Sequence, residues 1–138
     1  MTRAIHQPDW VPAYGHQLHM SGVHFDTLRI QGIRAEEVAA RLGRLTGDDA
    51  GPIVWQGTGL RWMYFLLPPR TAGDRSWPLD VERFGTRHQV SYVGVPALNG
   101  HTWPLMWQSW PTPTAPFVNA DRLWSALGRA DRLGRPPT

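Results

Sequence analysis

The chain has 138 residues, a net charge of +3 and no cysteine, which predicts one domain and excludes disulfides, thiolate metal sites and thiol nucleophiles. All 14 residues in the Lys+Arg count are arginine, which excludes a lysine Schiff base and a P-loop lysine. No apolar run approaches the roughly 18 residues of a membrane span and the first residues lack the apolar core of a secretory signal, so a cytoplasmic protein is expected.

The first part of the chain is predicted to contain an irregular segment, a strand and a helix. Residues 1–22 are interrupted by proline and glycine, which favours irregular structure. Residues 23–30 alternate between two sets of side chains and predict a strand. Residues 34–45 place apolar side chains at helical spacing and predict a helix, which Gly47 ends.

The middle of the chain is predicted to be a series of short strands. The runs, each next to glycine or proline, are 52–56, 60–67, 79–84, 89–95 and 103–107. The first two flank Gly57-Thr58-Gly59, which is typical of a hairpin. The last is expected at a sheet edge, because Pro104 has no N–H for a central ladder.

The C-terminal part is predicted to be a connector, a helix and a tail. Residues 108–118 are rich in proline and threonine. Asn119 is a suitable N-cap for a helix over 119–130, and residues 131–138 are expected to fray. The element order β-α-β-β-β-β with a final helix predicts one α+β domain over 1–138 with a mainly antiparallel sheet and two helices.

Three histidines have a spacing that suggests a metal site. His16, His19 and His24 follow the pattern H-x2-H-x4-H. A zinc site needs three or four ligands in fixed geometry, and the expected irregular segment has no helix that would hold His16 and His19 on one face. The sequence therefore favours surface or capping histidines and leaves metal binding open.

Catalytic side chains are sparse. No serine lies in a G-x-S-x-G elbow or has a histidine in a pattern that indicates a base. Asp26 is the acidic residue inside an otherwise apolar strand. Such a carboxylate binds a metal, pairs with an arginine or lies on a solvated face, and an ion pair or a solvated face is the more common outcome.

The order of the motifs resembles one known family. An aspartate strand is followed by a helix, by Q-G-T-G-L-R-W-M-Y-F at 56–65 and by V-S-Y-V-G-V-P at 90–96. This order resembles the N-terminal domain of the bifunctional DNA primase/polymerase (prim-pol) family, in the archaeo-eukaryotic primase superfamily. The resemblance covers residues 22–107 and implies a prim-pol-like core there, in a short and degenerate form.

The chain departs from the family at its functional positions. The family's D-x-D strand supplies two metal-binding carboxylates, whereas here Asp26 is followed by Leu28. Trp62 stands where the family has a nucleotide-site histidine, and Glu82 lines up with the third acid. Two-metal phosphoryl transfer needs clustered carboxylates to hold cations about 3.5–4 Å apart. The resemblance thus implies the fold, and the departures argue against primase or polymerase activity.

We therefore expect a prim-pol-like module without synthesis activity that binds nucleic acid or a nucleotide. Arginines beside aromatic side chains suit phosphate and base, so the expected contact residues are Thr58, Gly59, Arg61, Trp62, Arg83 and Arg87. Arg122 and Arg129 form a further basic face, for which an ordinary solvated helix face is the alternative. No cofactor is expected.

Two alternatives stay open. A protein-interaction or regulatory module is favoured by Trp103, Trp107 and Trp110 next to the proline-rich connector, because tryptophan and arginine dominate interface hot spots. An active metal-dependent nucleotidyltransferase would use Asp26 and Glu82 with Mg²⁺ or Mn²⁺. The sequence leaves the oligomeric state open and predicts no membrane partner.

Overall fold

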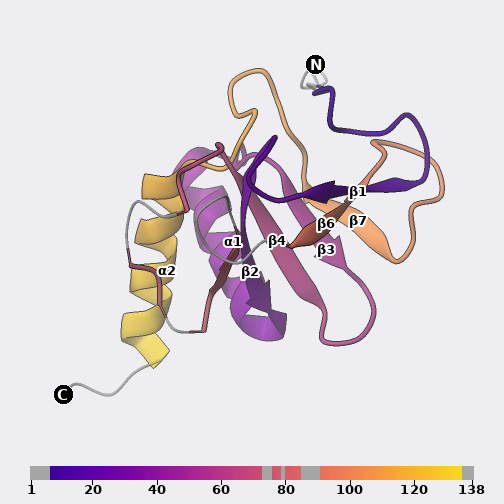
Figure 1. Cartoon of the computed structure of the whole chain (residues 1–138). Coiled ribbons are helices and arrows are strands. Elements are labelled where there is room, and N and C mark those ends of the chain that lie inside the picture. Colours follow the sequence, from indigo (N-terminus) through magenta and orange to yellow (C-terminus); the bar gives the residue numbers. More distant parts are fainter. Residues whose placement is uncertain (1–6, 73–75, 79, 85–90, 135–138) are drawn as a thin grey trace.

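A computed structural model of the chain describes residues 7–72, 76–78, 80–84 and 91–134 (Figure 1). Within these residues the elements are β1 (His16–Met20), β2 (Asp26–Gln31), α1 (Gly32–Thr46), β3 (Ile53–Gln56), β4 (Trp62–Leu67), β5 (Glu82–Phe84), β6 (Tyr92–Pro96), β7 (Leu105–Ser109) and α2 (Ala120–Gly134). Neither of these two helices has the length and apolar character of a membrane span.

Antiparallel pairing organises both sheets. Five strands form one sheet in the order β5-β2-β4-β3-β7, and β1 pairs with β6 in a separate two-stranded ribbon. The predicted hairpin is confirmed as the β3–β4 pair, with Ile53 opposite Phe65. β7 lies at the edge of the sheet, as Pro104 predicts, although the strand begins only at Leu105. The predicted α+β fold with a mainly antiparallel sheet is confirmed.

The five-stranded sheet packs its helices on one face. Leu28 and Ile30 of β2 and Phe65 of β4 are fully buried there, together with Val38 and Leu42 of α1. These two α1 residues belong to the apolar arc that the helical spacing predicts. Helix α1 lies over β2 and β4, and α2 packs beside α1 in the same layer (Figure 1). Burial of this face supplies the main hydrophobic core.

The opposite face of the sheet is covered by the β1–β6 ribbon. Val93 and Val95 of β6 pack against Val54 and Leu66 of the sheet, with Phe25 completing the contact. In Figure 1 the ribbon and α2 lie on opposite sides of β2 and β4, with α2 at the left. The fold therefore has three layers: helices, five-stranded sheet and ribbon.

One expected irregular segment contains a strand. Residues 1–22 are predicted to lack regular structure, but His16–Met20 forms β1. The prediction is wrong here because β1 has four exposed residues out of five and no clear burial pattern. Its order comes from antiparallel pairing with β6, where Gln17 stands opposite Val95, and that long-range partner leaves no local signal in the sequence.

Two helix ends follow the signals in the sequence. Gly47 ends α1 with φ 63°, and its N–H donates to the carbonyl of Gly43. Asn119 caps α2, because its side-chain oxygen accepts the N–H of Arg122 at 3.0 Å. α1 begins at Gly32, two residues before the predicted start, without a side-chain cap. The expected frayed tail is wrong for 131–134, since α2 continues to Gly134.

Candidate functional site

The aspartate of the resemblance is buried at the start of β2. Asp26 is 2% exposed, and its Oδ2 accepts the N–H of Ala72 at 2.9 Å. Its Oδ1 has no hydrogen-bond partner among the described residues. Leu28, where the family has its second aspartate, is fully buried in the helix-side core. The Asp26 carboxylate thus anchors the segment after β4 to the sheet.

The two acids of the resemblance lie on opposite faces of the sheet. Side chains alternate along β2, so Asp26 shares the helix-side face with Leu28, while Arg29 points to the other face. Glu82 stands opposite Arg29 in the β2–β5 register and accepts a hydrogen bond from the guanidinium of Arg29 at 2.6 Å. A shared metal site therefore finds no support in this placement of Asp26 and Glu82.

The ring of Trp62 is stacked against Arg29, a residue that was not predicted to belong to the site. The guanidinium carbon of Arg29 lies 4.0 Å from the centre of the Trp62 ring, which is a cation–π contact. Trp62 stands opposite Gln31, at the far end of β2 from Asp26. Gln31 lies five positions after Asp26 along β2, so the two ends of the strand are roughly 17 Å apart. The structure thus groups Trp62 with Glu82 and Arg29, and it separates all three from Asp26.

Only some of the expected nucleic-acid contacts are gathered in one place. Thr58, Gly59 and Arg61 are exposed on the turn before β4, where Gly59 and Arg61 have φ values of 62° and 54°. The N–H of Arg61 donates to the carbonyl of Thr58 at 3.2 Å. Arg83 is half-buried on β5, and Arg122 is exposed on α2. Arg87 and the side chain of Arg129 lie outside the described residues.

The three histidines do not converge. His19 and His24 are in contact edge to face, with ring centres 5.4 Å apart. His16 projects to the other face of β1, because it lies three positions before His19 and side chains alternate along a strand. Burial lowers the pKa of His19, the charge of His24 lowers it further, and a hydrogen bond to the carbonyl of Trp10 opposes the shift. The described part of the chain holds no group of three or more His, Cys, Asp or Glu suited to a metal ion.

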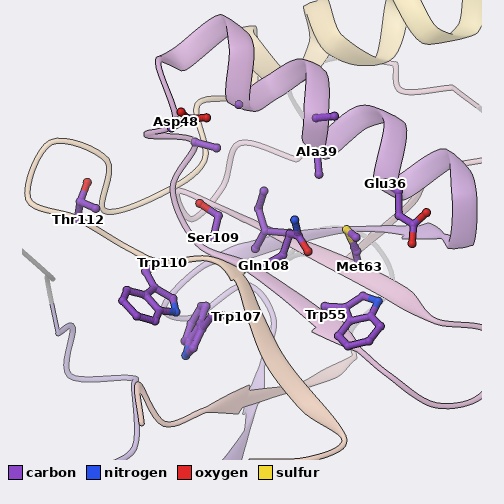
Figure 2. Close-up of a pocket in the computed structure, with 14 residues that line it drawn as sticks. Glu36, Ala39, Asp48, Trp55, Met63, Trp107, Gln108, Ser109, Trp110 and Thr112 are labelled. Atoms are coloured by element: carbon purple, nitrogen blue, oxygen red, sulfur yellow. The ribbon is translucent and has the colours of Figure 1, made fainter. Parts of the chain in front are cut away.

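A groove opens on the helix side of the sheet, between α1 and the β3–β7 edge (Figure 2). We call it the tryptophan groove, and its volume is about 920 Å³. Its lining consists of Glu36, Ala39, Ala40, Gly43, Asp48, Ala50, Ile53, Trp55, Met63, Trp107, Gln108, Ser109, Trp110 and Thr112. Ile53 and Met63 at its bottom are nearly fully buried in the helix-side core, whereas Trp55 and Trp110 in its lining keep exposed area.

The two walls of the groove differ in chemistry. Along α1 the lining residues are Glu36, Ala39, Ala40 and Gly43, which recur at helical spacing and are small apart from the glutamate. On the sheet side, Ile53 and Met63 are 1% and 2% exposed and form an apolar floor. Glu36 and Asp48 stand at opposite ends of the groove in Figure 2. The described lining contains two carboxylates and no arginine.

Tryptophans form the rim of the groove opposite α1. Trp110 is 45% exposed although it is the largest kind of apolar side chain. Trp107 is fixed, since its indole N–H donates to the carbonyl of Ala97 at 3.0 Å and its ring packs on the ribbon-side core. Trp55 is half-buried and meets Trp103 edge-on, with ring centres 6.5 Å apart. Trp103, 62% exposed, extends this aromatic surface beyond the groove.

The wall next to Trp110 is fixed by hydrogen bonds across the chain. Thr112, 5% exposed, donates its hydroxyl to Asp49 at 2.6 Å, and Thr114 donates to the same carboxylate. The N–H of Ala115 donates to the hydroxyl of Thr112 at 3.0 Å. These bonds join the connector to the loop that follows α1. The proline-rich segment is therefore held in place as a wall of the groove.

No protein-family model, curated protein or solved structure matches this chain. The resemblance to prim-pol domains thus rests on the motifs alone and stays a prediction. What the chain does must be inferred from its own surfaces. The tryptophan groove and the turn at Arg61 are the two candidates.

Trp107 and Trp110, predicted as interface residues, both line the groove. Glu36, Ala40 and Gly43 on α1 were not predicted as site residues. The signal for Ala40 and Gly43 is the small size of residues next to the apolar arc of the helix, which is compatible with close approach by another element.

Proposed function

We propose that the chain is a protein-interaction module that binds a segment of a partner protein in the tryptophan groove. The observation that carries the proposal is a groove of about 920 Å³ with an apolar floor and a tryptophan rim, open beside an edge strand. Ligand sites combine an apolar lining with a few polar groups, and tryptophan is enriched among the residues that dominate binding energy. Trp110 and Trp103 supply exposed aromatic area of the kind that marks interfaces.

The charge of the groove supports a protein ligand over a nucleic acid. Glu36 and Asp48 line it, and no arginine does among the described residues. Nucleic-acid affinity depends on neutralising phosphates with basic side chains, so two carboxylates would repel a polyanion. A peptide segment has no such requirement and can pack apolar side chains against the exposed parts of Trp55 and Trp110.

Selection of peptides tests this function directly. A phage-displayed library of random 12-residue peptides would be selected on the whole chain, and enriched peptides measured by fluorescence anisotropy. We expect Ala40→Phe, which places a ring inside the groove, and Trp110→Ala to weaken binding by at least about 10-fold, the effect of losing roughly 1.4 kcal/mol. Trp124→Ala is the matched control. Trp124 is 41% exposed, close to the exposure of Trp110, but it lies on α2 and does not line the groove.

Loss of peptide binding must be distinguished from loss of the fold. The proposal is contradicted if no peptide is enriched, or if enriched peptides bind the Ala40→Phe variant as tightly as the parent chain. Thermal unfolding of each variant checks the fold, and Ala40 is exposed, so its replacement disturbs no buried contact.

A second candidate function is nucleic-acid binding at the turn before β4. The observation in its favour is the exposed Arg61 beside the half-buried Trp62, in a chain with a net charge of +3. Base stacking on an aromatic ring and an adjacent guanidinium is a common way to hold single strands. Part of the Trp62 ring is already occupied by Arg29, which reduces the area left for a base.

Anisotropy titration with labelled single- and double-stranded DNA at several salt concentrations tests this candidate. Binding that falls with salt and is weakened by Arg61→Ala would favour it. Arg44→Ala serves as the control, since Arg44 is exposed on α1 and is not among the expected contact residues. Absence of binding near physiological salt would contradict it.

A further inference from the structure

We propose that the occupant of the tryptophan groove is a basic amphipathic helix, seated beside α1 as a third helix on that face of the sheet. The inference rests on the proposed function, because it names the class of partner that the same groove takes. It follows from three features of the groove: the small residues of α1, the irregularity of the edge strand and the carboxylates at the two ends.

The α1 wall suits a second helix. Ala39, Ala40 and Gly43 face the groove along one turn of α1, so only Glu36, at the end of this stretch, places a long side chain between α1 and a neighbour on that side. Helices pack with axes 8–10 Å apart, and small residues at the contact allow the shorter distance. α1 already packs against one helix, α2, in the same layer. A helix in the groove would extend that layer over β3.

The edge strand disfavours the other common mode, in which an extended peptide adds a strand to the sheet. In the β3–β7 register, Ile53 stands opposite Ser109 and Val54 opposite Trp107, so Gln108 is an extra residue in β7. Such a bulge interrupts the ladder and twists an edge away from further pairing. Gln108 is exposed and lines the groove instead.

The carboxylates at the two ends of the groove favour a positively charged partner. Glu36 is exposed and makes no ion pair among the described residues, and Asp48 lines the opposite end. From Glu36 to the end of α1 at Thr46 the helix rises about 15 Å, which is the length of a partner helix of about 10 residues. Basic residues near the two ends of such a helix would meet the two carboxylates, with apolar residues between them packed against Trp55 and Trp110.

The test uses peptides enriched from the 12-residue library on the whole chain. We expect them to be net basic and to gain helical circular dichroism on binding. A lactam bridge between positions i and i+4, which favours helix, should raise affinity by about 3-fold or more. Glu36→Arg should lower affinity by about 3- to 10-fold, because it replaces an attraction with a repulsion. Glu37→Arg is the matched control, since Glu37 is exposed on the same helix but does not line the groove.

Each contrary result has a distinct meaning. Enriched peptides that are acidic, or that lose binding when bridged, would overturn the helix proposal even if Ala40→Phe still abolishes binding, and the proposed function would stand. Binding indifferent to Ala40→Phe would overturn both. A concentration-dependent dimer in light scattering that Ala40→Phe dissociates would also overturn the proposal, because it assigns the groove to a second copy of the chain.

Discussion

The guanidinium of Arg29 lies 4.0 Å from the centre of the Trp62 ring, on the sheet face opposite the helices. The same group donates to Glu82 at 2.6 Å, so one arginine joins three neighbouring strands. The position that resembles a nucleotide-site histidine is therefore part of a stabilising cluster. Glu82, the expected third acid, belongs to that cluster too.

Replacing Arg29 should destabilise the sheet. We expect Arg29→Ala to lower the free energy of unfolding by about 1–2 kcal/mol, since it removes a cation–π contact and a partly exposed ion pair. Arg29→Lys should have a smaller effect, because lysine keeps the charge but stacks less well. Urea unfolding followed by tryptophan fluorescence measures the change. An Arg29→Ala midpoint equal to that of the parent chain would contradict the role of the cluster.

Asp26 is expected to be structural. Asp26→Ala leaves the buried N–H of Ala72 without its acceptor, so we expect a loss of about 1–3 kcal/mol in unfolding free energy. Asp26→Asn retains an acceptor oxygen and should be milder. Primer-extension assays with Mn²⁺ and all four nucleotides should show no incorporation by the parent chain. Incorporation that disappears in Asp26→Asn would show instead that the carboxylate is catalytic.

Two glycines should respond to alanine in opposite ways. Gly51 has a φ of 94°, and an added Cβ would lie 2.6 Å from the carbonyl oxygen of Phe117, so Gly51→Ala should cost about 2 kcal/mol or more. Gly128 lies within α2 and an added Cβ would meet nothing within 4 Å, so Gly128→Ala should add about 0.5–1 kcal/mol. Thermal melts of both variants distinguish the two cases, and a stabilised Gly51→Ala would refute the packing described between the loop after α1 and Phe117.

Stability should fall in mild acid because of His19. Burial, and then the charge of His24, lowers the pKa of His19 below its ordinary value of 6.5, so the unfolded chain takes up a proton more readily than the folded one. The contribution of neutral His19 to the free energy of unfolding is complete above pH 6.5 and is lost as the pH falls through the folded-state pKa of His19. His19→Gln should flatten the pH dependence of the unfolding free energy in this window.

Local signals in the sequence predicted most of the fold. The helical spacing in α1, Gly47 at its end, the Asn119 cap and the glycine turn before β4 each act over a few residues, and the structure has them where predicted. β1 was missed because its order depends on β6, far along the chain. Pairing over such distances leaves no periodicity to read.

The candidate site was only partly predictable for the same reason. Trp107 and Trp110 stood out as large apolar residues beside a connector. The α1 wall and the sheet floor come together only through tertiary packing, as does the contact of Arg29 with Glu82, 53 positions later. Residue types at Asp26 and Glu82 suggested shared chemistry, yet the strand period places them on opposite faces.

The central claim is that the tryptophan groove is the binding surface, and the indole N–H signals of the eight tryptophans test it most directly. Each signal is assigned in ¹H–¹⁵N spectra by a Trp→Phe variant, and an enriched library peptide is titrated into the ¹⁵N-labelled chain. We predict that the Trp55 and Trp110 signals shift and saturate with one affinity while those of Trp62 and Trp124 stay in place. Shifts confined to Trp62 or Trp124, with Trp55 and Trp110 unchanged, would contradict the account.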